Sequence, residues 1–332
     1  MEPSDTTFKK RRLDSEIDPG LSDVAERRER DQQLAESARQ QRELIRQKIK
    51  ELCQPPVDLP FEGVIPPPNF VKQFSEPAFD AKLPFPFVIE AYPDRFNISP
   101  EDAERNWQYV GREKFTTLVD EFECFYKDGS KTRLIVYGTR GYGKSHLLAA
   151  IVCLLAAGKT HVVYVPDCRE LVKRQVKYMK AAMLFAWADD TSKQQAILTL
   201  DGLDAMDGFL EVQSAISNVV FVIDQLNALE TEKDDDKDTV SVKSRLHQWL
   251  DGSLSPRTKG ILSSSANNHK ILGRLDRQDN YKMMYAYGGL TKVSDRSSNL
   301  FINRDGSDSD LERIGVLVGA ERKGGTSSRQ EV

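Results

Sequence analysis

A glycine-rich stretch near the middle of the chain has the residue types and spacing of a phosphate-binding loop. It runs Gly138-Thr139-Arg140-Gly141-Tyr142-Gly143-Lys144-Ser145 and fits the pattern GxxxxGK followed by Ser or Thr. The glycines allow positive φ angles and a close approach to oxygen atoms, and successive amide groups then point at the phosphates. Lys144 would place a positive charge on the β- and γ-phosphates, and Ser145 would offer a hydroxyl to Mg²⁺. The pattern predicts a site for a nucleoside triphosphate with Mg²⁺.

The residues on either side of this loop predict the two elements that must position it. Residues 132–137 are rich in Leu, Ile and Val and predict a buried strand, while residues 144–157 predict an apolar helix that Gly158 ends. A helix that starts at the loop directs the positive end of its dipole at the phosphates. We therefore add His146, in the first turn, to the predicted binding residues. A glycine-rich turn without a function is the alternative, and this strand–loop–helix context disfavours it.

A second acidic signal follows at the end of another predicted strand. Residues 219–223 are Val-Val-Phe-Val-Ile, and Asp224 and Gln225 come next. Ligands of open α/β sheets bind at the carboxyl ends of the strands, so Asp224 would lie beside the loop and hold Mg²⁺ through water. Gln225 stands where many ATPases carry an acid, and glutamine can orient a water but cannot take its proton at neutral pH. We expect Lys144, Asp224 and Gln225 to be catalytic and hydrolysis to be slow, unless Glu230 serves as the base.

The next predicted strand, residues 260–265, ends in serines, and Asn267 follows shortly after it. A polar residue at this place can contact the γ-phosphate or the attacking water, and we choose Asn267 as the fourth catalytic residue, with Ser265 as its substitute. A cap for a following helix is an equally good interpretation of Asn267. Arg274 and Arg277 could neutralise charge in the transition state, although solvated surface arginines are the more common case.

Strands alternate with helices after residue 101, which predicts an α/β fold: a three-layer αβα sandwich with a mostly parallel sheet covered on both faces. This P-loop NTPase domain would cover residues 101–290, and Ser99 and Pro100 predict the start of its first helix. Other helices are predicted over residues 113–126, 171–187, 196–210 and 242–250, and a further strand over residues 161–165. A low-complexity tail, residues 291–332, should be disordered.

Two segments precede this domain. Residues 1–53 are highly charged and predict a disordered start followed by a helix, because residues 22–52 contain no Pro or Gly. The apolar residues of this helix predict either a solvated helix or part of a weak coiled coil that binds a protein partner or a second copy; they are Leu34, Ala38, Ile45, Ile49 and Leu52. Residues 54–100 form a strap rich in Pro and aromatic residues, and the aromatic side chains would pin it onto the core.

The composition narrows the classes of function. The net charge is −4, so no global basic field draws the chain onto nucleic acid. The longest apolar run, residues 147–157, is too short to cross a bilayer, and the start of the chain carries no secretory signal. Lys9-Lys10-Arg11-Arg12 could be read by nuclear import receptors or be a plain charged tail, so we expect the nucleus or the cytoplasm. The cysteines have no metal-ligand spacing and predict buried free thiols; they are Cys53, Cys124, Cys153 and Cys168.

Residues 107–114, Trp-Gln-Tyr-Val-Gly-Arg-Glu-Lys, resemble the hydrophobic-Gly-Arg-Glu box that precedes the P-loop in AAA-type and STAND-type ATPases. In these families the box lies against the adenine and the ribose, which implies that Gly111 and Arg112 bind the nucleotide. The P-loop, the Asp224 strand and the Asn267 strand follow in the expected order, so the resemblance covers residues 105–275. It implies an ASCE-class core that binds ATP, and the chain has no Asn/Thr-Lys-x-Asp guanine motif after the P-loop, which agrees.

Within that class, the P-loop region, the Val-Ile-Asp-Gln strand end and the Tyr-Gly-Gly-Leu of residues 287–290 are similar to the NTPase module of Crinkler and retrotransposon-hot-spot proteins. This resemblance implies an ATP-operated effector or switch, with nucleic acid as a partner and secretion into a host as further expectations. Such proteins usually carry a C-terminal effector domain, so we expect this chain to be truncated or divergent. An interaction protein that binds ATP without hydrolysing it is the alternative, and Gln225 favours it.

Overall fold

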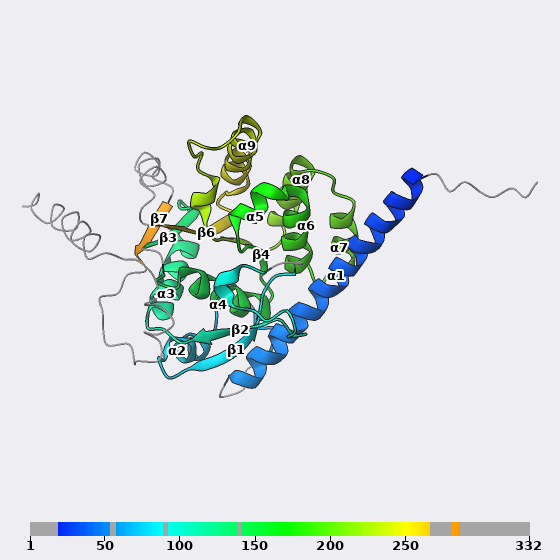
Figure 1. The fold of residues 1–332 in the computed structure, drawn as a ribbon. Coiled ribbons are helices and arrows are strands. Elements are labelled where there is room, and N and C mark those ends of the chain that lie inside the picture. The colour runs from blue at the N-terminus through cyan, green and yellow to red at the C-terminus, as the bar shows by residue number, and fades with distance from the viewer. Residues whose placement is uncertain (1–18, 54–57, 89–91, 139–140, 266–280, 286–332) are drawn as a thin grey trace, which may run out of the picture. The chain divides into compact units, whose positions relative to one another are not determined.

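The structure is a computed structural model that describes residues 19–53, 58–88, 92–138, 141–265 and 281–285. At its centre lies a parallel sheet of five strands in the order β4-β5-β6-β3-β7 (Figure 1). These strands are β3 (Arg133–Gly138), β4 (His161–Val165), β5 (Val219–Ile223), β6 (Thr258–Ser265) and β7 (Tyr281–Tyr285). β6 pairs with both β3 and β5, so one strand separates the glycine-rich loop from Asp224. Because the strands are parallel, both sites lie at the same edge of the sheet.

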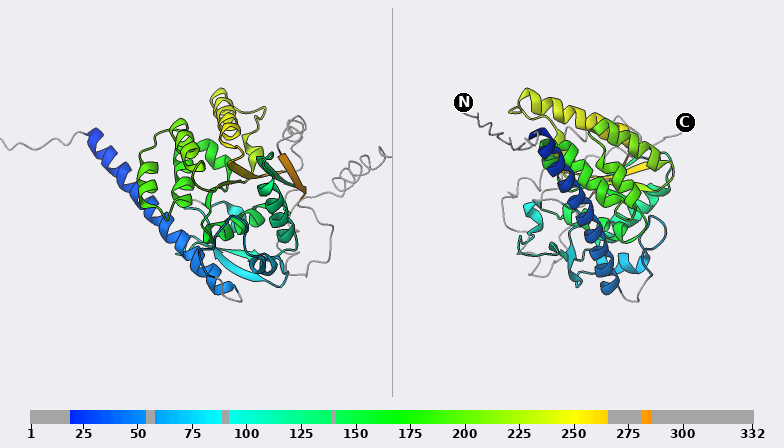
Figure 2. Two further views of the ribbon diagram at one scale, coloured as in Figure 1. Left: turned by 180° about the vertical axis from the view of Figure 1, so that it is seen from behind. Right: turned by 90° about the vertical axis from the view of Figure 1, so that its right-hand side faces the viewer.

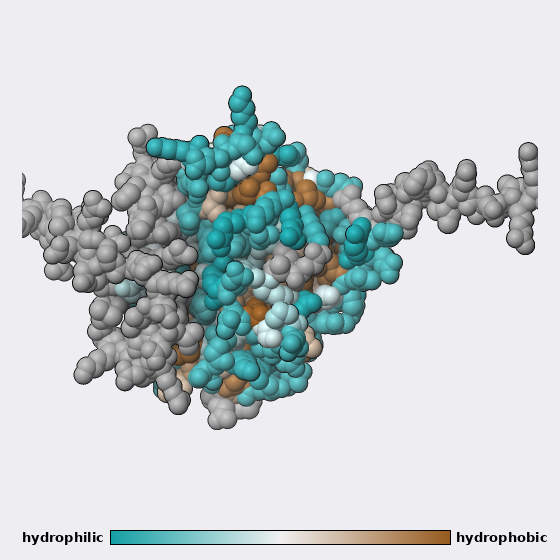
Figure 3. Space-filling model, in the orientation of Figure 1, coloured by the Kyte–Doolittle hydropathy of each residue, from teal (hydrophilic) through white to brown (hydrophobic). Residues whose placement is uncertain are grey.

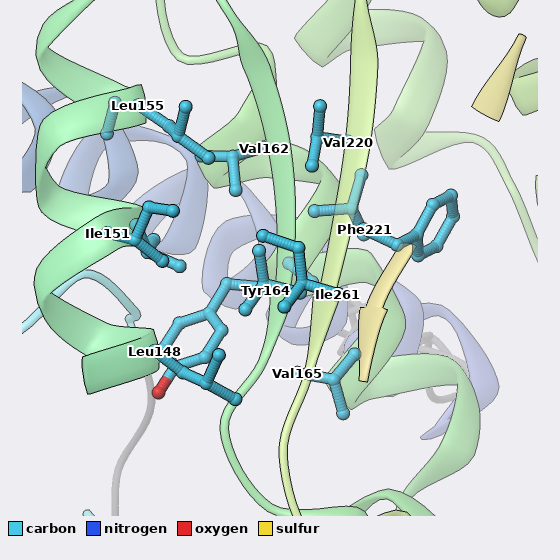
Figure 4. Packing of buried hydrophobic residues seen from close by; sticks show 14 of the residues in the cluster. Leu148, Ile151, Leu155, Val162, Tyr164, Val165, Val220, Phe221 and Ile261 are labelled. Carbon is cyan, nitrogen blue, oxygen red and sulfur yellow. The ribbon is translucent and has the colours of Figure 1, made fainter. Parts of the chain in front are cut away.

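Helices cover both faces of this sheet, which confirms the predicted three-layer α/β fold (Figures 1 and 2). α3 (Lys114–Lys127) and α4 (Lys144–Ala157) lie on one side, and α9 (Lys237–Ser253) lies on the other. Figure 4 shows Val162 and Tyr164 of β4 turned toward α4, while Phe221 of β5 points the other way. The Phe221 ring packs edge-on against Trp249 of α9. Alternate side chains of the strands therefore fill two separate layers of core.

Three helices differ from their predicted bounds. The single helix expected over residues 171–187 is two helices, α5 (Cys168–Lys173) and α6 (Gln175–Ala186), because Arg174 leaves the helical region with φ −140° and ψ 49°. The helix expected over residues 196–210 is α7 (Thr191–Leu198) and α8 (Leu203–Ser214), with an extended Gly202 before α8. α9 is longer than predicted, since Asp251 and Gly252 continue the helix instead of ending it.

The Pro-rich strap is folded against the rest of the domain. It contains α2 (Pro68–Ser75), β1 (Asp80–Pro84) and the 3₁₀ turn η1 (Asp94–Phe96). β1 pairs antiparallel with β2 (Asn106–Val110), which follows the strap. Pro68 lies in the first turn of α2, where proline is tolerated. The aromatic side chains of the strap are buried, among them Phe70, Phe74, Phe85 and Phe87. The prediction that these side chains pin the strap onto the core is confirmed.

The predicted helix start at Ser99 is wrong, because this segment makes tight turns. Asp102 N donates to Ser99 O (3.2 Å), and Arg105 N donates to Asp102 O (3.0 Å). The side chains act locally as well: Ser99 Oγ accepts from Glu101 N (3.3 Å), and Asp102 Oδ1 accepts from Glu104 N (3.0 Å). Ser and Asp favour such turns for the same reason that they favour helix caps, since each can bond a backbone amide nearby.

α1 (Pro19–Leu52) is one long helix that crosses the outside of the domain (Figures 1 and 2). The expectation of a solvated helix is wrong, because its apolar stripe packs on α4 and α6. Ala35, Ala38, Ile45 and Ile49 are each at most 3% exposed. The stripe that would have formed the seam of a coiled coil is therefore covered by the chain itself.

Arg42 is the polar centre of this contact. Its side chain is 1% exposed and lies at the C-terminal ends of α4 and α6. Over distances of 2.6 to 3.3 Å it donates to the carbonyls of Ala156, Gly158, Thr160, Phe185 and Ala186. The last carbonyls of a helix lack internal donors and carry the negative end of its dipole, so a buried guanidinium suits them. Burial lowers the pKa of Arg42 to about 10, which leaves it charged at neutral pH.

Replacing Arg42 with methionine should lower the free energy of unfolding by about 3–5 kcal/mol, because buried carbonyls lose their donors. Urea unfolding followed by circular dichroism measures the change. Lys50→Met is the control, since Lys50 is exposed on the same helix, and should shift stability by less than about 0.5 kcal/mol. Equal stability of the two variants would show that Arg42 does not anchor α1.

One face of the described residues is mainly polar (Figure 3). Figure 3 shows hydrophilic residues over most of the visible face, with small separate hydrophobic areas. No helix in the described ranges has both the length and the apolar character that crossing a bilayer requires. Cys124 is exposed, contrary to the prediction, while the other cysteines are buried as predicted. The basic cluster of residues 9–12 and the tail predicted over residues 291–332 lie outside the described residues.

Candidate nucleotide-binding site

The glycine-rich loop joins the end of β3 to the start of α4, as its motif requires. Gly141 and Gly143 have φ angles of 91° and 73°, which residues with a side chain rarely adopt. At the start of α4, Leu147 N donates to Gly143 O (3.0 Å). The amides of residues 144–146 precede this bond, in the turn where a helix has no internal acceptors for them. They are the groups that a helix N-terminus offers to a phosphate.

Lys144 holds its ammonium within the loop. Its Nζ donates to the carbonyl of Gly138, the last residue of β3, at 2.7 Å. Burial lowers the pKa of Lys144, and the nearby Asp224 carboxylate opposes that shift. Ser145 follows in the first turn of α4 and is half-buried. The loop thus has its cation and its hydroxyl at the N-terminal end of one helix.

Arg112 ties the strap to this loop. Its Nη1 donates to Tyr142 O (3.2 Å), and a Cβ on Gly143 would lie 1.8 Å from the same nitrogen. A Cβ on the preceding Gly111 would lie 2.1 Å from Glu76 O, so this position also requires glycine. Burial lowers the pKa of Arg112. Of the two residues expected beside the base and the sugar, Arg112 therefore contacts the backbone of the loop, whereas Gly111 lies against Glu76.

His146 contributes its ring to an aromatic cluster at the strap. The imidazole lies 5.0 Å from the ring of Phe96 and 5.4 Å from that of Trp107, measured between centroids. Burial, with Arg112 and Arg95 nearby, lowers the pKa of His146 to about 3, so the ring is neutral at physiological pH. Its side chain thus packs between α4 and the strap, and its backbone amide is the group that faces the loop.

Asp224 follows β5 at the carboxyl edge of the sheet and is 1% exposed. Its Oδ1 accepts from Ser263 Oγ on β6 (2.5 Å) and from the backbone N of Gln225 (2.9 Å). Its Oδ2 accepts from Arg95 Nη2 (3.1 Å). The carboxylate is therefore fixed from three sides, with one oxygen committed to the sheet and the other to the strap.

Arg95 is a residue of this site that the sequence did not reveal. It lies in η1 and donates from Nη1 to Asp167 Oδ2 (3.2 Å), beyond the end of β4. It also bonds to Pro166 O and to Asp224, so it bridges the ends of two neighbouring strands. In the sequence, Arg95 is marked only by its neighbour Phe96, an aromatic residue that the fold buries. This local pattern does not predict a contact with the ends of the strands.

Gln225 adopts a left-handed conformation, with φ 60° and ψ 42°. Non-glycine residues in this region are uncommon and often belong to functional sites. Among the described residues its side-chain amide makes no hydrogen bond, so it is available to a ligand. The other candidate base, Glu230, lies with Oε1 3.5 Å from His247 Nε2 on α9 and is 7% exposed. The Glu230 carboxylate therefore lies against α9.

Some predicted residues cannot be placed. Thr139, Arg140, Asn267, Arg274 and Arg277 lie outside the described residues, and so does the side chain of Ser265. Ser263, on the same strand as Ser265, was not predicted, and its hydroxyl donates to Asp224 Oδ1. Ser263 lies two positions before Ser265, so the two side chains lie on the same face of the strand. This alternation is the signal in the sequence that could have predicted Ser263.

The donor set of this edge suits a hard divalent cation. Mg²⁺ prefers oxygen ligands and usually takes one or two carboxylates together with phosphates and waters. Ser145 and Asp224 supply a hydroxyl and a carboxylate of this kind. Among the described residues no group of three or more His, Cys, Asp or Glu side chains forms a separate metal site. The residues therefore fit Mg²⁺ bound jointly with a nucleotide rather than a protein-only metal cage.

A comparison with protein families places the core of the chain. The model of the NACHT domain matches residues 132–297, which is half of the chain. The chain belongs to the NACHT family. NACHT domains are P-loop NTPase modules of the STAND class, so this chain carries a nucleotide-binding module. The match starts at β3 and includes the glycine-rich loop and Asp224, whereas α1, the strap, Arg95 and Arg112 precede the matched residues.

Comparisons with individual proteins add little to the NACHT assignment. Among solved structures the chain is similar to AMPPCP-bound DnaA from Aquifex aeolicus, at 13% sequence identity and a TM-score of 0.32. The similarity covers 65% of this chain and 63% of that chain, so less than two thirds of DnaA is spanned. A search of curated proteins gives no match. The STAND-type resemblance is confirmed by the NACHT match, while the narrower resemblance to Crinkler proteins stays a prediction.

Proposed function

We propose that this NACHT module binds ATP together with Mg²⁺ and hydrolyses it slowly, as an ATP-operated switch. The observation that carries the proposal is the juxtaposition at one sheet edge of the phosphate loop and Asp224, with a single strand between them. The positive φ of Gly141 and Gly143 and the ammonium of Lys144 support the phosphate part of the site. The oxygen donors Ser145 and Asp224 support its Mg²⁺ part.

Each residue has a defined task in this proposal. The amides of residues 144–146 and the Lys144 ammonium hold the β- and γ-phosphates, and the Ser145 hydroxyl and Asp224 carboxylate provide oxygen ligands. Mg²⁺ would neutralise charge that develops on the phosphates. Gln225 orients the attacking water through its amide but takes no proton from it at neutral pH, which makes turnover slow.

The choice of ATP over GTP rests on the Gly-Arg-Glu box and on the lack of a guanine motif. Calorimetric titration of the full chain with ATP and with GTP, each with Mg²⁺ and with EDTA, tests this choice. We expect GTP to bind at least about 10-fold more weakly, the effect of one or two lost hydrogen bonds. Equal affinity for both nucleotides would remove the base preference and leave only the phosphate site.

A second candidate is an interaction protein that binds ATP without turnover, and Gln225 favours it because the site lacks an acid at that position. Partner binding would then use the strap or the exposed face of α1, since the apolar stripe of α1 is buried. We also propose an effector role like that of Crinkler proteins, with nucleic acid as a partner. Phosphate release by the purified wild-type chain separates the two candidates, because only the first predicts multiple turnovers.

A further inference from the structure

A buried cluster of opposite charges joins the strap to the edge of the sheet. Arg95 of η1 lies between Asp167, beyond β4, and Asp224, beyond β5, and its side chain is 21% exposed. The two carboxylate side chains are 6% and 1% exposed. Arg95 does not come from the loops that follow these strands. It precedes Asp167 by 72 residues and Asp224 by 129 residues in the chain.

The two carboxylates do not depend on Arg95 equally. Asp167 has a second partner, because Arg169 donates from Nη2 to its Oδ2 (3.0 Å) and from Nε to its Oδ1 (3.2 Å). Among the described residues Arg95 is the only cation in an ion pair with Asp224. Removing Arg95 would therefore leave Asp167 paired and Asp224 with a buried charge that another cation must neutralise.

The hydrogen bonds of Asp224 show where that cation would act. Its Oδ1 already accepts from Ser263 and from the backbone of Gln225, so Oδ2 is the oxygen that remains for a ligand. Arg95 Nη2 holds this same oxygen. A Mg²⁺-bound water and the guanidinium would compete for it, and two cations this close repel each other in a site of low dielectric.

We propose that Arg95 is a tethered competitor of Mg²⁺ for Asp224, so that binding of a Mg²⁺-nucleotide releases Arg95 and loosens the 3₁₀ turn that carries it. The proposal rests on the nucleotide site proposed above. In the exchange Asp224 passes from the singly charged guanidinium to Mg²⁺, whose remaining charge the nucleotide phosphates would neutralise, and Asp167 keeps Arg169. Because η1 is part of the strap, the nucleotide state is transmitted to an element outside the NACHT module.

The release of Arg95 would first loosen η1 itself. Phe96 N donates to Pro93 O (3.0 Å), and Asn97 N donates to Asp94 O (3.0 Å), which are the bonds that close the turn. Phe96 also packs on His146 at the start of α4, so the turn touches the phosphate-binding helix directly. Without its anchor on Asp224, the turn keeps its own backbone bonds, this packing and the bonds of Arg95 to Asp167 and Pro166.

The first test is the Mg²⁺ dependence of nucleotide binding in the full chain. Affinity for AMPPCP is measured by calorimetry across a range of Mg²⁺ concentrations and in EDTA. In Arg95→Met the Mg²⁺ concentration for half-maximal enhancement, measured relative to the affinity of the same variant in EDTA, should fall about 10-fold because the competitor is gone. Arg95→Lys, which keeps a charge but lacks the fork that spans two carboxylates, should give an intermediate shift.

Arg169→Met is the matched control, because Arg169 bonds Asp167 but not Asp224, and its Mg²⁺ midpoint should equal that of the wild type. An unchanged or higher midpoint in Arg95→Met would overturn the proposal, since Arg95 would then be neutral toward the ion or help to bind it. If AMPPCP fails to bind under every condition, the proposed function falls with it. If AMPPCP binds and only the midpoint is insensitive, this inference alone is wrong.

A second measurement uses the wild-type chain and so does not depend on how the variants fold. Hydrogen exchange of the Phe96 and Asn97 amides is compared in AMPPCP with Mg²⁺ and in AMPPCP with EDTA. We expect exchange at these amides to become at least several-fold faster when Mg²⁺ is present, while the amides of β2 stay protected. Equal or slower exchange with Mg²⁺ would show that η1 is not released.

Discussion

Replacing Lys144 with alanine should lower the affinity for Mg²⁺-ATP by about 100- to 1000-fold. The ammonium is the charge that the loop directs at the β- and γ-phosphates, and hydrogen bonds to charged groups contribute about 1.5–3 kcal/mol each. Two such bonds at the lower end of this range, about 3–4 kcal/mol together, correspond to the expected loss of affinity. In the structure Lys144 Nζ donates to Gly138 O at the end of β3. Calorimetry with ATP and Mg²⁺ measures the effect.

Lys159→Ala is the control for this experiment. Lys159 lies just past the other end of α4, is exposed, and pairs with Glu62 far from the loop. Its removal takes one positive charge from the chain, as Lys144→Ala does, so the comparison separates a local contact from a change in net charge. Affinities that fall equally in both variants, or in neither, would contradict the assignment of the phosphate loop.

The sequence predicted the phosphate loop and the Asp224 strand well because both depend on local patterns. A run of β-branched residues, a glycine-rich turn and an apolar helix are each read within about ten residues, and the structure places them as expected. The same holds for β5, whose five residues are all buried. The sheet order is different in kind. The placement of β6 between β3 and β5 is a long-range pairing that no local pattern contains.

The N-terminal helix shows a second limit. Its charged residues outnumber its apolar ones, so the sequence indicated a solvated helix, but small residues such as Ala35 and Ala38 let α1 approach α4 and α6 closely. Arg42 then donates to five carbonyl oxygens, which come together only when the ends of those two helices lie side by side. A buried arginine of this kind cannot be told from a surface arginine by its neighbours in the sequence.

Arg95 was missed for a related reason. The strap was correctly interpreted as pinned by aromatic side chains, and Phe96 is one of them. The partners of Arg95 follow it by 72 and 129 residues, at the ends of strands that become neighbours only in the folded sheet. The candidate site is thus predicted in its phosphate half, which is local, and not in the half that the strap contributes.

The geometry around Gln225 makes the hydrolysis step testable. The residue directly follows Asp224 and is held in the left-handed region, which aims its side chain independently of β5. Glutamine and glutamate have the same shape, so exchanging them leaves the backbone strain unchanged. Glu230, the only other acid that the sequence offered nearby as a base, has its carboxylate against His247 of α9. Among the described residues the site therefore contains a glutamine, which can orient water, while Glu230, the candidate base, lies against α9.

Gln225→Glu should consequently raise kcat for ATP hydrolysis by roughly 100-fold, the low end of what general-base assistance contributes. The new carboxylate would lie beside Asp224, so its pKa depends on the cations of the site, and we expect the increase to be largest above neutral pH. Affinity for ATP should stay nearly unchanged, because the substitution adds no contact to the ground state. Steady-state phosphate release measures kcat, and calorimetry measures the affinity.

Asp224→Asn is the companion variant, and it should lower both turnover and Mg²⁺-dependent binding, since it removes the charge that attracts Mg²⁺ while keeping the bond to Ser263. The pair of variants distinguishes a site that lacks a base from one that already has it. If the wild type turns over briskly and Gln225→Glu leaves kcat unchanged or lower, another residue activates the water. The candidates for that residue are Glu230, whose contact with His247 is 3.5 Å long, and a residue of a neighbouring copy.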